Sequence, residues 1–280
     1  MELGKVIGSI VANANRENRR EEGDYIADDG LLYCGKCHTP KEYPQEWDGK
    51  MVLRPIPCKC KHEQNRREEE ARKRQSRLDY LADMRRTGFP DVEMRKWCFA
   101  ADDGNSAGLM KVARKYADNF KAMKSNGTGL LLYGDVGCGK SFAAACIANE
   151  LIDKGVPCMM TNFSRIINRL QENFDGRQKY IDSLRRFDLL VIDDMAVERN
   201  TEYVWENVMN IIDSRYRSGL PLIVTTNLTI GELADPTDIR RKRVYSRLME
   251  MCVPLEAKGI DRRTKKLERN IQNARELLGL

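Results

Sequence analysis

From about residue 100 onward, short apolar runs alternate with segments in which apolar residues recur at helical spacing. Buried strands of a parallel sheet read as short, nearly continuous apolar runs, and the helices that cover them show one apolar stripe. We therefore predict an α/β domain with a central parallel sheet flanked by helices. Its strands are expected at GLLLYGD (129–135), VPCMMT (156–161), FDLLVIDD (187–194), LPLIVTTN (220–227) and MCVPLE (251–256).

The chain before this domain has a different pattern. Residues 1–62 contain clustered cysteine, histidine, glycine and proline with few apolar runs, whereas residues 63–89 are rich in Arg and Glu. The second segment predicts a charged helical linker that ends at the Phe89-Pro90 turn. We expect three parts: an N-terminal module (1–62), the linker (63–89) and the α/β domain (90–280), which finishes in a basic helix.

An apolar stripe marks the start of the N-terminal module. It consists of Leu3, Val6, Ile7, Ile10 and Val11 on an otherwise polar segment with helical spacing. Such a stripe either packs inside the module or docks on a partner protein.

The excess positive charge is concentrated near the C-terminus. Of 48 basic and 42 acidic residues, 12 basic and 6 acidic fall between Asp238 and Glu276, so that this stretch carries the whole net charge of +6. It is either a solvated helical face or a contact for phosphate groups of nucleic acid or nucleotide.

Composition also indicates a compartment. No apolar run approaches the roughly 20 residues that a membrane span needs, and the apolar stretch at the N-terminus is too short for a secretory signal. We therefore expect a cytoplasmic protein with no membrane contact. The odd number of cysteines, nine, argues against a disulfide framework. Five of them are expected as small buried hydrophobic residues: Cys98, Cys138, Cys146, Cys158 and Cys252.

Directly after the first predicted strand, residues 134–141 read GDVGCGKS, the Gly-x4-Gly-Lys-Ser pattern of a phosphate-binding loop. Its glycines let successive N–H groups turn toward phosphate oxygens, and the loop opens a helix whose N-terminus attracts the same anion. Lys140 is expected to reach the β- and γ-phosphates, and Ser141 to ligate Mg²⁺. The nucleotide-binding residues predicted here are Gly134, Asp135, Val136, Gly137, Cys138, Gly139, Lys140, Ser141 and Phe142.

Polar side chains end two other predicted strands. LLVIDD supplies Asp193, expected to hold Mg²⁺, and Asp194, expected to orient or deprotonate the attacking water. LIVTTN ends in Asn227, whose amide is placed to position the same water or the γ-phosphate at the carboxyl edge of the sheet. Solvated turn residues are the alternative for all three.

Four cysteines form two close pairs, Cys34-x2-Cys37 and Cys58-x-Cys60, separated by 20 residues. Four soft ligands that converge from two loops are typical of a structural Zn²⁺ site with no open catalytic position. His38 or His62 could each replace one cysteine. Because little apolar sequence surrounds the pairs, the fold of this zinc-binding segment (34–62) is expected to depend on the metal.

Four segments together resemble the DnaC/DnaI-type helicase loaders: GDVGCGKS, LLVIDDMAVERNTEYVWENVMNIIDSRYRSGLPLIVTTN, RVYSRLME and GIDRR. These are AAA+ ATPases of a family that also includes the IstB transposition helpers. The resemblance covers about residues 90–263. It implies an AAA+ phosphate-loop domain that binds ATP or ADP with Mg²⁺ and hydrolyses ATP.

The resemblance also implies roles for single residues. Asn227 looks like sensor 1, and Arg247 in VYSRL looks like the arginine finger that reaches the ATP site of a neighbouring subunit, so turnover should depend on assembly. Arg263 in GIDRR is similar to the sensor 2 arginine, with Arg262 as the alternative. Two further alternatives are Glu198 in place of Asp194 as the group that activates water, and the basic run Arg240–Arg243 in place of Arg247.

By resemblance, the chain is an ATP-dependent loader whose N-terminal module grips a hexameric DnaB-type replicative helicase. It assembles into an open ring or spiral, and single-stranded DNA enters the AAA+ channel and stimulates hydrolysis. The alternative is an IstB-like ATPase that regulates DNA transposition. A third reading is a nucleotide-gated scaffold with negligible turnover.

Overall fold

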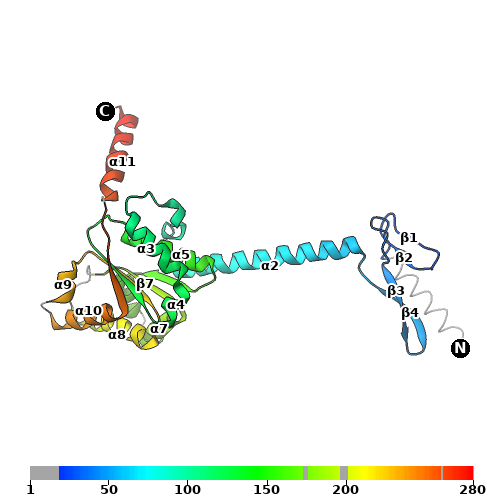
Figure 1. Cartoon of the computed structure of the whole chain (residues 1–280), viewed down its shortest axis with the longest axis horizontal. Coiled ribbons are helices and arrows are strands. Elements are labelled where there is room, and N and C mark those ends of the chain that lie inside the picture. Colours follow the sequence, from blue (N-terminus) through cyan, green and yellow to red (C-terminus); the bar gives the residue numbers. More distant parts are fainter. Residues whose placement is uncertain (1–18, 173–175, 196–200, 237, 260, 280) are drawn as a thin grey trace. The chain divides into compact units, whose positions relative to one another are not determined.

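The computed structural model describes residues 19–172, 176–195, 201–236, 238–259 and 261–279, and only the backbone of 262–266 and 268–269. The chain divides into two compact units, Met1–Leu78 and Asp79–Leu280, each described here by itself (Figure 1). The predicted stripe from Leu3 to Val11 and the candidate Glu198 lie outside the described residues.

The second unit contains a five-stranded parallel sheet in the order β6-β7-β8-β5-β9 (Figure 1). Each strand overlaps one of the predicted apolar runs, so the prediction of a central parallel sheet flanked by helices is confirmed. The strands are β5 (Gly129–Tyr133), β6 (Cys158–Thr161), β7 (Leu189–Met195), β8 (Leu222–Thr226) and β9 (Cys252–Glu256).

Helices join and cover these strands. They are α3 (Ala107–Asp118), α4 (Phe120–Ser125), α5 (Lys140–Asp153), α6 (Phe163–Glu172), α7 (Arg177–Ser183), α8 (Glu202–Ser218), α9 (Ile230–Ala234) and α10 (Ile239–Met251), with short 3-10 turns at Met94–Lys96, Phe99–Ala101 and Leu184–Arg186. A further helix, α11 (Arg262–Leu278), follows the last strand, and the side chains described in it are exposed. Within the described residues no helix is both long and apolar enough to cross a bilayer.

The strands divide their side chains between two hydrophobic cores. Leu130 and Leu132 of β5 pack in the core that contains α3 and α5, whereas Leu131 packs in the core that contains α6, α8 and α10. Successive side chains of a strand point to opposite faces, so a strand that is apolar at every position requires cover on both sides. This requirement is why the runs are continuous rather than alternating.

One buried cation ties α8 to the loops beside it. The Arg215 side chain is 2% exposed, and its guanidinium donates hydrogen bonds to the carbonyl oxygens of Phe187 and Asp188, both at 2.8 Å, and of Pro221, at 2.8 and 3.1 Å. Loop carbonyls buried without a partner are costly. Arg215 thus holds the approaches to β7 and β8 together.

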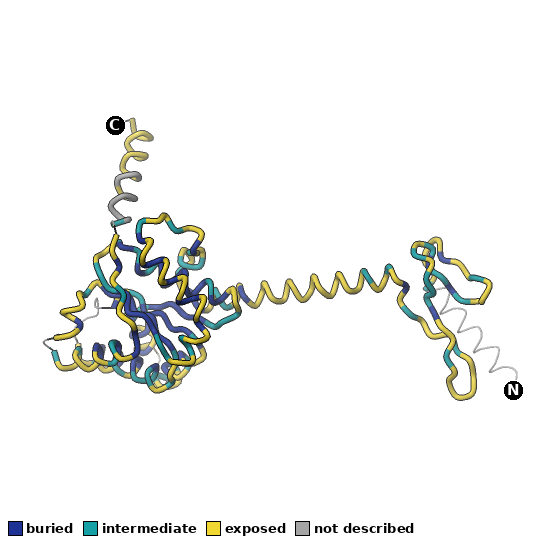
Figure 2. Tube along the Cα trace, in the orientation of Figure 1, coloured by how far each residue is buried: buried dark blue, intermediate teal, exposed yellow. Residues whose placement is uncertain are grey.

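A long helix, α2 (Lys59–Gly88), begins in the first unit and ends in the second. Its residues 64–80 are all exposed (Figure 2), whereas Leu81 and the following Phe89 are buried in the first core of the second unit. Gly88 lies so close to β6 that a Cβ there would stand 2.2 Å from the Cys158 carbonyl oxygen. Close backbone approach therefore fixes where the helix ends.

The first unit has two small antiparallel pairs, β1 (Tyr25–Ile26) with β2 (Leu32–Tyr33), and β3 (Glu42–Trp47) with β4 (Lys50–Pro55). Polar contacts make up much of its interior. The buried Asp24 carboxylate accepts a hydrogen bond from Lys41 Nζ at 2.6 Å, and buried Glu42 accepts one from the Leu32 backbone N–H at 2.8 Å.

Candidate functional site

A pocket of about 460 Å³ opens at the carboxyl edge of the sheet in the second unit. In an open α/β sheet this edge is where ligands bind, because the loops that follow parallel strands meet there. The pocket is lined by Trp97, Ala101, Asp103, Val136, Gly137, Gly139, Lys140, Ser141, Phe142, Asp193, Asp194, Thr225 and Asn227.

The loop between β5 and α5 provides one wall of this pocket. Gly134, Gly137 and Gly139 all have positive φ, at 125°, 79° and 88°. A Cβ at Gly137 would stand 1.8 Å from the Asp261 carboxylate, and one at Gly134 would stand 2.6 Å from the Ala257 carbonyl oxygen. Glycine is therefore required both by backbone conformation and by the close packing of the GIDRR segment.

Lys140 begins α5 and lies against the loop. Its Nζ donates to the carbonyl oxygens of Gly134 at 2.7 Å and Asp135 at 2.6 Å, and burial lowers the pKa of its ammonium. The N-cap of α5 is Gly139, which has no side chain to accept from the first N–H groups of the helix. The wall thus combines a cation with a helix N-terminus, which is an anion-binding arrangement.

The two aspartates lie at an irregularity of β7. The pairing of β7 with β8 shifts register between Ile192 and Met195, and Asp194 has a positive φ of 56°. In a regular strand, neighbouring side chains point to opposite faces. The irregularity lets both Asp193 and Asp194 line the pocket.

Thr225 of β8 connects this pair. Its hydroxyl donates to Asp193 Oδ1 at 2.6 Å and accepts from the Asp194 backbone N–H at 2.8 Å. Asn227 Nδ2 donates to Asp194 Oδ1 at 3.3 Å. The carboxylate oxygens suit Mg²⁺, and the nearby ammonium suits the phosphate to which the metal would be bound. Thr225 was not among the predicted site residues, although its hydroxyl at the end of an apolar strand is a usable signal.

Two aromatic side chains also line the pocket. Trp97 and Phe142 have ring centroids 5.7 Å apart with planes tilted by 53°. Asn149 of α5 holds the Trp97 segment by donating to the carbonyl oxygens of Met94 at 2.8 Å and Trp97 at 2.9 Å. Such a wall suits a flat heterocycle. Trp97, Ala101 and Asp103 come from a segment in which no sequence motif was visible.

Several predicted residues lie elsewhere. Gly134, Asp135 and Cys138 are in the loop but not among the described residues that line the pocket. The side chains of Arg262 and Arg263 lie outside the described part of the chain.

Arg247 lies on α10, away from the pocket lining. Its guanidinium is 3.4 Å from both Asp213 and Glu250, and its centre is 4.3 Å from that of the Tyr216 ring. Tyr216 in turn donates to Glu250 at 2.5 Å. Within a single chain, Arg247 is engaged by this cluster.

Four of the five remaining cysteines are buried as predicted: Cys138, Cys146, Cys158 and Cys252. The prediction for Cys98 was wrong, because this residue is exposed between the two 3-10 turns at Met94–Lys96 and Phe99–Ala101.

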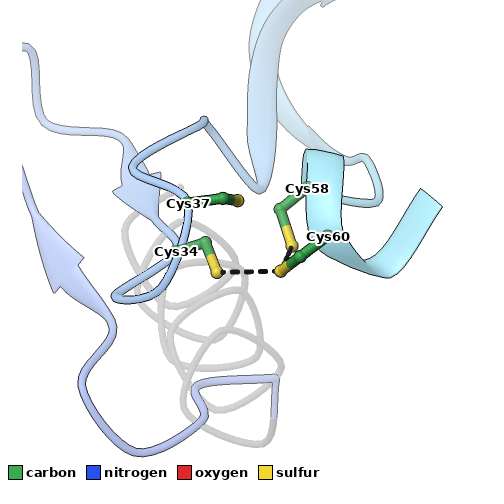
Figure 3. A group of neighbouring side chains, drawn as sticks. All are labelled: Cys34, Cys37, Cys58 and Cys60. Atoms are coloured by element: carbon green, nitrogen blue, oxygen red, sulfur yellow. Dashed lines mark hydrogen bonds between the residues drawn. The ribbon is translucent and has the colours of Figure 1, made fainter. Parts of the chain in front are cut away.

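The four cysteines of the two pairs converge in the first unit (Figure 3). Their sulfur atoms lie within 4.8 Å of one another, with Cys34 to Cys60 at 3.6 Å and Cys58 to Cys60 at 3.4 Å. Sulfur ligands at about 2.3 Å from a tetrahedral zinc ion would be about 3.8 Å apart. The donor set therefore fits Zn²⁺.

Local contacts polarise these thiols. A hydrogen bond with the Thr39 hydroxyl lowers the pKa of Cys37 to about 5, whereas the neighbouring sulfur atoms of Cys58 and Cys34 raise the pKa of Cys60 to about 12. Four thiolates this close together would repel one another, so a bound cation would be needed to keep all four deprotonated. Within the described chain this metal-competent set contains only cysteines; the His38 Nδ1 instead lies 3.2 Å from the Tyr25 hydroxyl.

Comparison with known proteins identifies relatives of the second unit and part of α2. The replicative helicase loader DnaI of Bacillus subtilis (strain 168) is 26% identical over 149 residues, 49% of this chain and 48% of that protein. The replicative helicase loader DnaC of Escherichia coli (strain K12) is 28% identical over 150 residues, 52% of this chain and 58% of that protein. The chain spans about half the length of the curated relatives it matches.

A putative insertion sequence ATP-binding protein of Sinorhizobium fredii (strain NBRC 101917 / NGR234) is 30% identical over 112 residues, 39% of this chain and 37% of that protein. Among solved structures, the DnaC helicase loader has a similar fold, with a TM-score of 0.54 at 23% identity over 60% of this chain and 100% of that chain. The family model of IstB-like ATP binding proteins matches residues 64–270. The chain therefore belongs to the IstB-like ATP-binding proteins, the DnaC/IstB family that its motifs indicated.

Proposed function

We propose that this protein is an ATP-hydrolysing loader that binds a hexameric DnaB-type replicative helicase and deposits it on single-stranded DNA. The observation that carries the proposal is the meeting of a phosphate loop, a carboxylate pair and Asn227 at one pocket of a DnaC/IstB family member. Two relatives that are named replicative helicase loaders support the loader function over other functions of the family.

In this mechanism the phosphate loop and Lys140 hold the β- and γ-phosphates. Ser141 and Asp193, which share the pocket, would hold Mg²⁺, which would supply positive charge to neutralise the phosphate oxygens. Asp194 accepts the proton of the attacking water or orients it, and the Asn227 amide fixes the Asp194 carboxylate. Phosphoryl transfer needs this kind of positioning more than covalent chemistry.

Stabilisation of the remaining negative charge of the transition state is assigned to a residue of a neighbouring chain. Arg247 is proposed to reach the ATP site of the next subunit, with Arg263 as sensor 2 within the chain. Because Asp213, Glu250 and Tyr216 hold Arg247 in a single chain, it has to exchange these partners for the phosphate when subunits assemble into an open ring or spiral. Hydrolysis then depends on assembly, and DNA in the channel stimulates it by favouring assembly.

In the first unit, the cysteine cluster is proposed to hold one structural Zn²⁺ and to organise the part of the chain that grips the helicase. Its interior has few apolar side chains, so the metal would replace a hydrophobic core.

The alternative function is regulation of DNA transposition. It is favoured by the family description and by the insertion sequence relative from Sinorhizobium fredii. Both functions use the same nucleotide site, and the partner protein separates them.

The partner is tested by tagging the full chain and recovering complexes from its host with ATP or ADP present. We expect a DnaB-type helicase, identified by mass spectrometry and retained more strongly in one nucleotide state. Lys140→Ala, which removes the phosphate-binding ammonium, is expected to abolish the difference between the two nucleotides. Recovery of a transposase without the helicase would contradict the loader proposal and support the alternative.

Thr225→Val tests whether the Thr225 hydroxyl supports the carboxylate pair of Asp193 and Asp194. Valine has a similar shape but leaves Asp193 without its donor, and the loss of about 1–2 kcal/mol corresponds to a five- to thirtyfold rise in the Mg²⁺ concentration for half-maximal ATP hydrolysis. The control is Thr161→Val, at the end of β6 and outside the described pocket lining. An unchanged Mg²⁺ dependence in Thr225→Val would exclude this role.

Arg247→Ala tests the shared ATP site. Loss of an arginine finger is expected to lower the rate of ATP hydrolysis about a thousandfold or more. A mixture with Lys140→Ala chains should restore part of the rate, because each variant supplies what the other lacks. Arg240→Ala, in the basic run that is the alternative finger, is the comparison on the same helix and is expected to keep the rate, since this side chain pairs with Asp238 of its own chain. Full hydrolysis by dilute monomeric Arg247→Ala chains would rule the finger out.

The zinc proposal is tested by metal analysis of the purified chain, which should contain about one zinc ion per chain. Cys58→Ser is expected to lose the metal and to make the first unit sensitive to limited proteolysis. Cys98→Ser, an exposed cysteine outside the cluster, is expected to change neither property. A stable, protease-resistant first unit without metal would refute the structural role.

A further inference from the structure

The hairpin of β3 and β4 in the first unit has two faces with different chemistry. Residues paired across an antiparallel ladder lie on the same face. One face, here named the aromatic–basic face, consists of the pairs Tyr43–Arg54, Gln45–Val52 and Trp47–Lys50. The opposite face consists of the pairs Glu42–Pro55, Pro44–Leu53 and Glu46–Met51.

The aromatic–basic face is exposed at both ends, and its central pair, Gln45–Val52, is half-buried. The Trp47 residue is 62% exposed and Tyr43 is 41% exposed, and Lys50 and Arg54 are exposed as well. Large exposed aromatic side chains clustered on one face indicate a binding surface. The tight turn at Asp48 and Gly49, both with positive φ, keeps the strands paired to their ends, so the surface is already formed.

Charge selects the kind of ligand. The aromatic–basic face carries two cations and no carboxylate, whereas the opposite face carries Glu42 and Glu46. The Arg54 guanidinium lies over one face of the Trp47 ring, 5.1 Å from its centre, so that positive charge and aromatic surface form one contact area. Alternating rings and cations complement a ligand with flat bases and a phosphate backbone.

We propose that the aromatic–basic face binds single-stranded DNA. The rings of Trp47 and Tyr43 stack on bases while Lys50 and Arg54 contact phosphates. The two aromatic residues are four positions apart on β3, or about 13 Å, so different bases of one strand can stack on the two rings. A single strand fits better than a duplex, because paired and stacked bases hide the faces on which rings stack.

This contact goes beyond the proposed DNA channel of the ATPase domain, and it needs no nucleotide. It is measured with the full chain, without ATP, by fluorescence anisotropy of labelled dT20 at low salt. Trp47→Ala is expected to weaken binding about tenfold, the typical loss of one stacking ring. Arg54→Ala is expected to reduce the slope of log affinity against log salt by about one.

The matched controls lie on the opposite face of the same strands. Met51→Ala and Leu53→Ala remove exposed apolar side chains of comparable size and are expected to leave affinity within about twofold, as surface changes outside a contact do. Trp47→Phe keeps a stacking ring and is expected to retain most of the affinity. Zinc content and the unfolding transition of each variant confirm that the module stays folded.

Equal losses in Trp47→Ala and Met51→Ala, unchanged binding in Trp47→Ala, or equal affinity for duplex DNA would overturn the proposal. Binding that requires ATP, disappears in Lys140→Ala and is normal in Trp47→Ala would also overturn it, and would place the DNA contact in the ATPase domain. That last result would leave the proposed loader function standing. Conversely, a chain that binds DNA through the hairpin but does not bind the helicase would refute only the loader function.

Discussion

The parallel pairing of β5, β7 and β8 is the constraint on which the nucleotide pocket depends. Because these strands run in one direction and are adjacent in the order β7-β8-β5, the segments after them meet at one edge. That edge brings Lys140, Asp193 and Asn227 together although nearly 90 residues separate the first from the last. The middle strand then becomes the support of the site, since Thr225 of β8 holds the carboxylate pair of β7.

A local departure from regular structure completes this arrangement. A regular β7 would send Asp193 and Asp194 to opposite faces of the sheet. The register shift and the left-handed backbone of Asp194 turn both side chains toward the pocket, and the hydrogen bonds of Thr225 and Asn227 hold that conformation. Backbone strain at a ligand site is tolerated where neighbouring contacts fix it, so the contacts around β7 serve both stability and chemistry.

The two units differ in what their interiors are made of. The second unit has two hydrophobic cores, one on each face of its sheet. Among the described residues of the first unit few apolar side chains are buried, whereas a buried Asp24 carboxylate pairs with Lys41 and four cysteines converge. Aromatic side chains such as Trp47 and Tyr43 remain on the surface of this unit. A module with a polar interior can thus present its aromatic residues to ligands.

The parallel sheet, the phosphate loop, the polar ends of β7 and β8 and the two close cysteine pairs could be predicted from the sequence, because each depends on periodicity or close spacing along the chain. Three features could not: Trp97, Asp103 and Thr225 share the pocket, Cys98 is exposed, and Arg247 is engaged by Asp213 and Glu250. These facts depend on contacts between segments distant in sequence or on local solvent exposure, and no short motif encodes them. Physical proximity across the fold, set by strand order and helix packing, was needed to reveal them.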